Sequence, residues 1–583
     1  MTTSLVDAES LLALEIGSVT TRAVLFDVVE GRYRYLGAGS APTTAGAPFH
    51  NIMDGVRGAL QGLEQITGRT FIGADGQLMT PARPDGTGVD ACVASLSVGP
   101  PLKVLAVGLL EDVSTESAQN LATTTYAQVI ETMSLNDRKK TTARLDNILR
   151  LRPDLVVVAG GIEKGASKSV LSILESVGLA CGVLPKEQRP EVLFAGNSAL
   201  VKEVQQTLGT LASLQVAPNV RPTLDIEQLT PAQPALAQVF RHVRARQIRG
   251  VQDVDLWTGG KLLPSAMAFG RTIRYVSMEF PKKGVLGVDV GASATTIASA
   301  FAGDLILSVQ SRLGLGENLP GILSMCNPED ILRWLPIDIS TDRLWDYIYN
   351  KSLYPASIPA TEEQLWIEHA LATQAVYLAI RQARKGYPAT VRAPLPGLLP
   401  LFEPIIATGS VLTQAPRRGQ ALMILLNALQ PTGVTTIALD RNNLASMLGA
   451  AAGKNHYLTV QSLDATNFYN LGTIISPIGQ ANPGTPVLHV RMTLPGGHET
   501  TREVKFGALE ILELPMGQSA TLRLQPLHRF DVGMGGPGVG GSAVVTGGEC
   551  GVIIDARGRP IRLHNEPGRR HEQIKKWNTV LGS

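Results

Sequence analysis

Residues 11–22 read LLALEIGSVTTR, and residues 284–296 read GVLGVDVGASATT; the two stretches share one pattern. Each has an apolar run, an acid, one apolar residue, a glycine and small residues that include hydroxyls. Each then continues into a second run of mainly apolar residues, at 23–26 and at 297–301. This pattern predicts a β-hairpin whose turn carries little side-chain bulk.

Such a hairpin suits a phosphate group. Glycine allows backbone N–H groups to approach an anion, and serine or threonine hydroxyls add further donors. The acid at the end of the strand, Glu15 in the first copy and Asp289 in the second, is expected to hold Mg²⁺ or its waters rather than phosphate itself. Two copies so far apart in the chain predict a duplicated fold that grips one phosphate chain from both sides.

The composition is typical of a well-packed globular protein. The chain has 583 residues, of which 44% are hydrophobic and 17% charged, and this length predicts three or more domains. The formal net charge is +2, so bulk charge gives no reason to expect binding to nucleic acid or to a membrane surface. The longest apolar runs, such as residues 155–159, have the length of a strand, so no membrane span is expected.

The cysteines and the first residues indicate the compartment. Cys92, Cys181, Cys326 and Cys550 lie far apart and form no CxxC pair. This spacing argues against a zinc site or a disulfide framework and fits the reducing cytoplasm. Residues 1–7 lack the basic region and apolar core of a cleavable signal, so we expect a cytoplasmic protein.

Periodicity predicts strands and helices in alternation through most of the chain. We expect helices over residues 51–66, 114–133 and 361–385. Between about 90 and 215, apolar strands end in glycines and are followed by helices. That order predicts β–α units with parallel strands, whose loops lie at the carboxyl ends of the strands.

Residues 312–318, RLGLGEN, form a second glycine loop soon after the second hairpin.

The end of the chain has a different character. After residue 456 the helical periodicity disappears, and alternating segments predict a β-rich region. The basic residues at 569–576 are expected to form the solvated face of a helix.

The order of these segments resembles the actin-like ATPase superfamily. More narrowly, the chain resembles the glutamate mutase accessory protein family, of the MutL or GlmL type, over residues 10–454. The stretches that carry the narrower resemblance are EIGS at 15–18 with TR at 21–22, LRPD at 151–154 followed by 156–161, FAGN at 194–197, DVG at 289–291, ALQP at 428–431 and ALDR at 438–441.

The resemblance implies an α/β fold with duplicated actin-like (ribonuclease H-like) ATPase domains. The first domain would cover residues 1–283 and carry an inserted α/β unit at about 90–215. The second would cover residues 284–455. Residues 456–583 would form a C-terminal β-rich domain outside the family's usual core.

The resemblance also implies one site for ATP and Mg²⁺, built from both hairpins and a later strand end. Glu15 and Asp289 would be the catalytic acids on the metal side. The residues expected to bind the nucleotide are Gly17, Ser18 and Thr21 in the first loop, Gly291, Ser293 and Thr295 in the second, and Thr408, Gly409 and Ser410 beside the adenosine.

Three positions depart from the family pattern. Glu15 stands where aspartate is usual, Thr296 stands where an acid is usual, and Ser410 follows Gly409 where a second glycine is usual. Hydrolysis needs a positioned water and a well-placed Mg²⁺. The departures therefore favour nucleotide binding over hydrolysis, and weak ATPase activity stays an open alternative.

The expected function is that of a chaperone-like accessory protein, in which ATP closes two domains and acts on a protein partner. The resemblance implies that the partner is a cobalamin-dependent mutase. The alternative is a non-catalytic actin-like scaffold or filament protein with a degenerate nucleotide site, which would form homo-oligomers. A small-molecule kinase would need a general base near its acceptor, and the sequence offers no convincing one.

Overall fold

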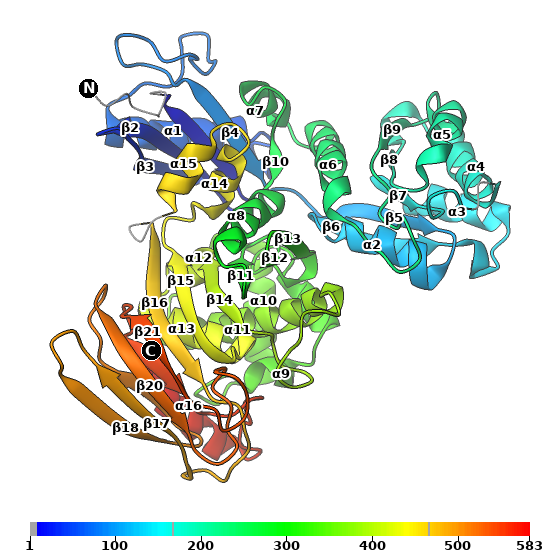
Figure 1. Ribbon diagram of the computed structural model, residues 1–583. Helices are drawn as coiled ribbons and strands as arrows, with labels where there is room; N and C mark the ends of the chain where they lie inside the picture. Colours follow the sequence, from blue (N-terminus) through cyan, green and yellow to red (C-terminus); the bar gives the residue numbers. More distant parts are fainter. Residues whose placement is uncertain (1–8, 166–167, 464–466, 583) are drawn as a thin grey trace. The chain divides into compact units, whose positions relative to one another are not determined.

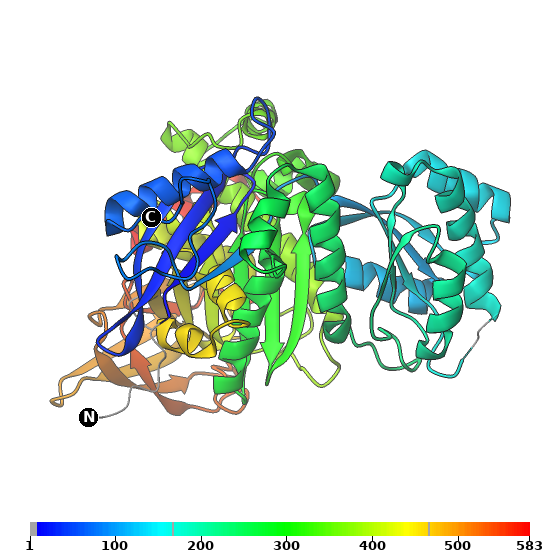
Figure 2. The same cartoon turned by 90° about the horizontal axis from the view of Figure 1, so that it is seen from above.

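The computed structural model describes residues 9–165, 168–463 and 467–582. The chain forms two compact units, whose elements are labelled in Figure 1 and seen from a second direction in Figure 2. The first unit contains residues 1–268 and 307–311, and the second contains residues 269–306 and 312–583. Within the described residues, no helix combines the length and the apolar character that crossing a membrane requires.

Five strands form the first sheet of the first unit: β1 (Leu11–Ile16), β2 (Thr20–Val29), β3 (Arg32–Pro42), β4 (Ala91–Leu96) and β10 (Leu263–Pro264). Their order is β10-β4-β1-β2-β3. Strand β1 is antiparallel to β2 and parallel to β4, while β10 is parallel to β4. The first predicted hairpin is therefore confirmed as the centre of this sheet.

Helix α1 (Met53–Thr67) lies against β2 and β3 and confirms the helix expected at 51–66. The contact is unusually close because β3 carries glycine where α1 crosses it. A Cβ on Gly39 would lie 2.0 Å from the carbonyl oxygen of Ala59 and 2.4 Å from the amide nitrogen of Leu63. The backbone of the helix therefore packs directly on the backbone of the strand.

A second sheet in the first unit consists of parallel strands: β5 (Leu102–Gly108), β6 (Ala127–Met133), β7 (Leu155–Ala159), β8 (Glu191–Phe194) and β9 (Ser213–Val216). Their order, β6-β5-β7-β8-β9, is one of the common doubly wound orders and confirms the predicted β–α units. The sheet begins at Leu102 rather than near residue 90, because β4 pairs with β1 instead.

Helices cover both faces of this inserted sheet, as Figure 1 shows. One apolar cluster joins the sheet to three helices, and two further helices contact the strands outside that cluster. The helices in the apolar cluster are α3 (Thr141–Leu151), α4 (Lys168–Val183) and α5 (Val201–Leu208). The helices outside it are α2 (Glu116–Ala122) and α6 (Gln233–Gln247).

The single helix expected at 114–133 is wrong. Helix α2 ends at Ala122, and residues 127–133 form β6, which pairs in parallel with β5. The hydroxyls of Thr123 and Thr124 donate to the carbonyl oxygens of Asn120 and Leu121, at 2.9 Å and 2.8 Å. Threonine hydroxyls that bond to nearby backbone in this way compete with continuation of a helix.

The second unit contains an eight-stranded sheet, apart from residues 307–310 of its edge strand β13, in the order β13-β12-β11-β14-β15-β16-β22-β19. The strands are β11 (Gly284–Val290), β12 (Thr295–Phe301), β13 (Asp304–Gln310), β14 (Phe402–Thr408), β15 (Gly433–Asp440), β16 (Phe468–Ser476), β19 (Leu509–Leu512) and β22 (Val552–Asp555).

The first five of these strands repeat the first sheet of the other unit. Numbered along the chain, both sheets run 3-2-1-4-5. Strand β11 is antiparallel to β12 and parallel to β14, and β15 is parallel to β14, as in the corresponding pairs of the first sheet. The predicted duplicated, ribonuclease H-like fold is confirmed by this shared order and direction.

The chain after residue 466 adds β structure to the second unit. Strand β16 pairs with β15, and β22 and β19 extend the same sheet. Four antiparallel strands in the order β18-β17-β20-β21 form another sheet: β17 (Pro486–Thr493), β18 (Glu499–Lys505), β20 (Ser519–Pro526) and β21 (Gly541–Thr546). An apolar cluster that includes Ile475, Val490 and Ile554 joins the two sheets, so the expected β-rich region is confirmed.

The remaining helices are α7 (Val251–Trp257), α8 (Ser265–Glu279), α9 (Pro328–Leu332), α10 (Thr341–Leu353), α11 (Glu362–Ala383), α12 (Ser410–Thr413), α13 (Arg418–Leu429), α14 (Ala445–Ala451), α15 (His456–Ser462) and α16 (Pro567–Leu581). Helix α11 confirms the helix expected at 361–385 and contacts β12 and α13. Helix α16 exposes Lys575 and Lys576, as expected, but buries Ile574, Trp577 and Leu581 near α13.

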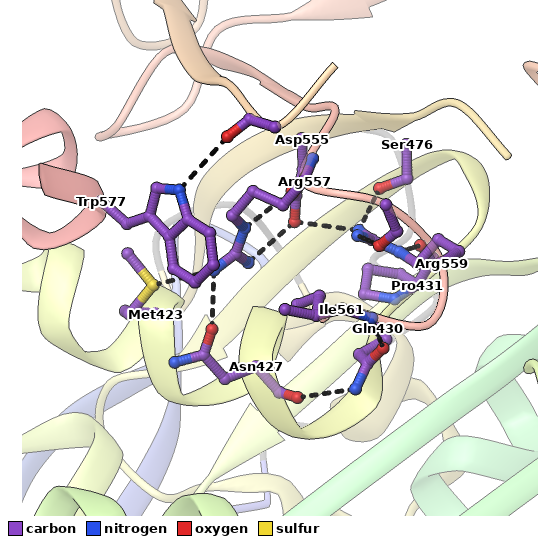
Figure 3. Close-up of polar contacts among 12 residues, drawn as sticks. Met423, Asn427, Gln430, Pro431, Ser476, Asp555, Arg557, Arg559, Ile561 and Trp577 are labelled. Atoms are coloured by element: carbon purple, nitrogen blue, oxygen red, sulfur yellow. Dashed lines mark hydrogen bonds and ion pairs between the residues drawn. The ribbon is translucent and has the colours of Figure 1, made fainter. Parts of the chain in front are cut away.

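A buried ion-pair network fixes the segment after β22 to α13 (Figure 3). The side chains of Asp555, Arg557 and Arg559 are all fully buried. Asp555 accepts from Arg557 at 2.8 Å and 2.9 Å and from Arg559 at 2.9 Å. Arg557 also donates to Asn427 Oδ1 on α13 at 2.7 Å, and Arg559 donates to the carbonyl oxygen of Pro431 at 2.8 Å. Burial alone would raise the pKa of Asp555, but the two guanidinium charges hold it well below its usual range.

Candidate functional site

The first hairpin ends in a tight loop closed by its glycine. The N–H of Gly17 donates to the carbonyl oxygen of Thr20 at 3.0 Å. A Cβ at position 17 would lie 2.8 Å from that same oxygen. The turn therefore needs a residue without a side chain, as the sequence indicated.

Thr43, at the end of β3, supports this loop from behind. Its hydroxyl donates to the carbonyl oxygen of Gly17 at 2.8 Å and lies 2.9 Å from the hydroxyl of Thr21. Its N–H donates to the carbonyl oxygen of Val19 at 2.9 Å. Thr21 is fully buried, so its hydroxyl belongs to the support of the loop. The sequence pattern around the hairpin gave no sign of Thr43.

The second hairpin repeats the turn of the first. The N–H of Gly291 donates to the carbonyl oxygen of Ala294 at 3.0 Å, the counterpart of the bond from Gly17 to Thr20. Thr295 occupies the position of Thr21; it is fully buried and donates to the carbonyl oxygen of Leu313 at 2.7 Å. The two loops are thus built alike, each with a buried threonine that holds the turn.

The second glycine loop of the sequence, residues 312–318, supports the second hairpin. The N–H groups of Leu315 and Gly316 donate to the carbonyl oxygens of Gly291 and Ala292, each at 3.0 Å. A Cβ on Gly314 would lie 2.4 Å from the carbonyl oxygen of Ala292, so glycine permits the close approach. The glycine pattern marked this loop, but only the structure shows what it supports.

These supports bind the carbonyl oxygens of the loops and leave N–H groups available. Among the described residues, no acceptor is bonded to the N–H of Ser18 or Val19 in the first loop. The same holds for the N–H of Ala292 and Ser293 in the second loop. Successive backbone N–H groups of this kind form concave sites that attract anions. Each loop can therefore receive a phosphate oxygen.

Glu15 and Asp289 occupy the same register position in the two sheets. Glu15 lies opposite Arg22 on β2 and Ser95 on β4. Asp289 lies opposite Thr296 on β12 and Thr408 on β14. Residues opposite one another on paired strands share a face of the sheet, so each acid is flanked by polar side chains.

The flanking residues differ in charge between the units. Asp289 lies opposite two residues with hydroxyl groups, and a carboxylate is a ligand that a cation such as Mg²⁺ prefers. Glu15 has a guanidinium opposite it, and a guanidinium competes with a metal ion for a carboxylate. Among the described residues, no group of three or more His, Cys, Asp or Glu side chains is arranged to hold a metal ion. A cation here would have a carboxylate and the phosphates of its ligand as partners.

The end of β14 contacts the second loop through Gly409. This glycine has a φ of 103°, and a Cβ on it would lie 2.2 Å from the carbonyl oxygen of Val290. The N–H of Gly409 donates to Asn443 Oδ1 at 3.2 Å, and the Thr408 hydroxyl donates to the same oxygen at 2.9 Å. Ser410 is exposed at the start of α12. The three predicted residues therefore follow one another along the end of β14, beside the second loop.

Two further residues, missed by the site prediction, hold this strand end. Asn443 has a φ of 48° and connects β15 to β14 through the two bonds above. Asp440 is fully buried and accepts from the N–H groups of Leu444 and Ala445, at 2.8 Å and 2.7 Å, at the start of α14. The motif ALDR, residues 438–441, contains Asp440 and was the available signal.

Each unit thus brings its own predicted residues together. Glu15, Gly17, Ser18 and Thr21 lie at one hairpin of the first unit. Asp289, Gly291, Ser293 and Thr295 lie at the matching hairpin of the second unit, next to 408–410. The fold therefore contains two equivalent loops, one in each unit, and each has an acid two residues before its glycine.

A family model described as MutL protein matches residues 11–466, well over half of the chain. The chain belongs to the MutL protein family. The match begins at the first residue of β1 and ends just before β16, so it covers both hairpins and the inserted sheet. The resemblance that the sequence motifs indicated is confirmed.

One curated relative of this MutL-family chain is the protein MutL of Clostridium tetanomorphum. The two are 22% identical over an alignment of 301 positions that covers 48% of this chain and 63% of the relative. The chain therefore aligns with less than two thirds of that relative's length.

Solved structures that match the MutL-family chain do so at low identity. Acetone carboxylase in its nucleotide-free structure is 12% identical with a TM-score of 0.29, covering 86% of this chain and 82% of the other. Diol dehydratase-reactivating factor in nucleotide-free form is 10% identical with a TM-score of 0.28, covering 76% and 99%. Because these scores are below 0.5, the fold assignment rests on the strand order of the two sheets.

Proposed function

We propose that this MutL-family chain is an accessory protein that binds ATP with Mg²⁺. The observation that carries the proposal is the pair of matching loops, each with an acid two residues before a glycine and two successive N–H groups with no acceptor among the described residues. Phosphate oxygens would accept from those N–H groups. Asp289 would hold Mg²⁺, and Gly409 would keep the second loop in place.

We also propose that a single nucleotide binds to both loops and closes the two units upon a partner protein. Family membership supports an accessory role, and the family resemblance of the sequence names a cobalamin-dependent mutase as the partner. The four cysteines are free thiols, which supports a cytoplasmic location. Binding energy that differs between open and closed states is what would move the units.

Calorimetric titration with ATP tests the nucleotide site. With Mg²⁺ present, Asp289→Asn is expected to weaken ATP binding about tenfold or more, because the cation loses a charged ligand. With EDTA present, the variant and the unaltered protein are expected to bind ATP alike. The matched control is Asp304→Asn, at the exposed first residue of β13 in the same sheet, which should bind as the unaltered protein does.

Equal binding by Asp289→Asn and the unaltered protein in Mg²⁺ would refute the role of this acid. Phosphate release above the Asp289→Asn background would add hydrolysis to binding.

For the partner, we expect added glutamate mutase to co-elute with the chain on size exclusion in one nucleotide state and not in the other. Identical elution profiles in ATP, in ADP and without nucleotide would contradict nucleotide-controlled partner binding.

A specific observation favours a second candidate, the scaffold with a degenerate nucleotide site. Arg22 lies opposite Glu15, where its counterpart opposite Asp289 is the neutral Thr296. The positive charge of Arg22 favours an ion pair with Glu15 over binding of a metal ion by Glu15. This candidate predicts no ATP binding, together with homo-oligomers or filaments that sediment equally with and without nucleotide.

A further inference from the structure

A pocket of about 320 Å³ lies in the second unit, and its lining includes no residue of either hairpin. One wall comes from the core of the fold, with Arg333 and Trp334 after α9 and Tyr377 on α11. The other wall comes from residues 560–570, between β22 and the first turn of α16. Because the family match ends at 466, this second wall lies outside the part of the chain that defines the family.

The lining is cationic and rich in hydrogen-bond donors. Its residues include Arg333, Arg570 and His564, and they include no aspartate or glutamate. His564 Nδ1 accepts the N–H of Glu566 at 3.1 Å, so the neutral ring carries its proton on Nε2. A site with several donors and no carboxylate favours an anionic ligand.

The two arginines are poorly neutralised by the protein itself. Arg333 has Asp330 at 3.9 Å, the limit for an ion pair, and stacks on the rings of Trp334 and Tyr377 at 5.0 Å and 5.6 Å. Among the described residues, the side chain of Arg570 makes one hydrogen bond, a long one of 3.5 Å to the carbonyl oxygen of Asn565. In the part of the chain that the structure describes, the Nε atoms of both arginines are buried without an acceptor.

The first turn of α16 adds to this positive charge. It contains Arg569 and Arg570 and no acidic residue. The N-terminus of a helix already carries a partial positive charge, so cations there are unfavourable unless an anion lies nearby. Glu566 pairs with Arg569 at 3.1 Å, which leaves the charge of Arg570 to be balanced otherwise. Burial and the charge of Arg570 lower the pKa of His571, the next residue, and the carboxylate of Asp338 partly opposes this shift.

The second wall is held rigidly by the buried network of Figure 3. Arg559, one residue before the pocket segment, is fixed by Asp555 and by the carbonyl oxygen of Pro431. Gln430 lines the pocket and accepts the N–H of Ile561 at 2.7 Å, while its amide nitrogen donates to the carbonyl oxygen of Asn427 at 3.4 Å. These bonds therefore fix the second wall to the end of α13.

We propose that this pocket binds a small organic phosphate. The phosphate lies between Arg333 and Arg570, where it neutralises both guanidinium groups. The apolar part of the ligand packs on Trp334, Ile561 and Leu563, which line the same pocket. The volume falls at the lower end of the range for small-molecule sites, which fits a compact ligand.

Calorimetric titration of the full chain with phenyl phosphate tests this site. Arg333→Gln and Arg570→Gln are each expected to raise the dissociation constant about tenfold or more, because each loses one charge-assisted contact. The matched control is Arg569→Gln, the neighbour of Arg570 on the same helix, whose side chain is 68% exposed and paired with Glu566. It should change the dissociation constant by less than about twofold.

Two further sets of titrations, with parts of the ligand and with lysine variants, test the same site. Inorganic phosphate and phenol, titrated separately, are expected to bind more weakly than phenyl phosphate, because each lacks one half of the ligand. Arg333→Lys and Arg570→Lys retain the charge and should recover part of the affinity; they also replace the glutamine variants if circular dichroism shows those to be unfolded.

Three outcomes would overturn the proposal. The first is no heat of binding with phenyl phosphate up to millimolar concentration. The second is equal weakening by Arg569→Gln, which would make the effect one of general charge. The third is unchanged binding in both pocket variants together with displacement by excess Mg·ATP, which would place the phosphate in the hairpin loops instead.

Discussion

Replacing Gly409 with alanine separates the role of the end of β14 from a general effect on stability. Gly409 has φ 103° and ψ 146°, a region that residues with a Cβ rarely adopt. The new Cβ would lie 2.2 Å from the carbonyl oxygen of Val290 and 2.7 Å from its carbonyl carbon. Ordinary contact begins at about 3.5 Å, so β14 and the end of β11 have to move apart by on the order of 1 Å.

The expected loss of stability has two parts. Backbone strain at a position of this kind costs on the order of 1–3 kcal/mol, and overpacking costs about 1–3 kcal/mol more. Gly397→Ala is the matched control, because Gly397 also has a positive φ, 90°, but a Cβ there would meet nothing within 4 Å. The control should therefore show the strain alone, and the difference between the variants, about 1–3 kcal/mol, measures the contact with Val290.

Urea unfolding and titration with Mg·ATP provide the two measurements. Val290 immediately precedes Gly291, so its displacement also moves the second loop, and ATP affinity should fall about tenfold or more in Gly409→Ala. Gly397→Ala should bind ATP normally. If the two variants unfold at the same urea concentration and bind Mg·ATP equally, then the end of β14 does not position the loop.

Three more perturbations have outcomes set by buried groups. Asp555→Asn leaves two buried arginines without their carboxylate and should cost about 3–5 kcal/mol in urea unfolding. Because the folded pKa of Asp555 lies below its ordinary value of 3.8, its stabilisation is complete above that value and is lost as pH falls below it; the variant should lack this acid dependence. Burial lowers the pKa of His369 to about 4 from 6.5, so the unfolded chain binds the extra proton between those values. Stability should therefore fall as pH drops from 6.5 to 4, by on the order of 3 kcal/mol, and His369→Phe should remove the slope seen in pH-dependent melting. Thr43→Val removes the hydroxyl behind the first loop and should cost about 1–3 kcal/mol and weaken ATP binding, whereas Thr20→Val, at an exposed position, should change unfolding by less than about 0.5 kcal/mol.

The hairpins could be predicted because their information is local. The alternation of residue types from 11 to 22 and from 284 to 296 specifies strand, tight turn and strand within a dozen or so positions. The register that places Glu15 and Asp289 at matching points follows from that turn. The prediction of a duplicated fold followed in turn from recognising the same pattern twice.

The supports of the loops could not be predicted in the same way. Thr43 meets Gly17 from 26 positions away, and Asn443 meets Thr408 from 35 positions away. Neither residue belongs to a repeated pattern, because its role depends on how the strands are brought together. A single threonine or asparagine near a strand end has many ordinary uses in turns, so its type alone does not mark it.

The wrong helix at 114–133 has a different cause. Its first half is helical in the structure, and the pattern failed only after Ala122. There Thr123 and Thr124 turn their hydroxyls back onto the helix carbonyls, and the following residues join a neighbouring strand. Tertiary pairing with β5 outweighed the local preference for a longer helix.

The continuation of the central sheet past residue 466 has a practical consequence for engineering this protein. A chain shortened to end at residue 466, where the family match ends, would lack β16. The backbone N–H and C=O groups of β15 that pair with β16 would then have no partner strand. Exposed edges of that kind recruit other chains and promote aggregation. Residues 468–476 therefore cover the edge of β15. A shortened version of the protein has to keep this strand or replace it with another that pairs with β15.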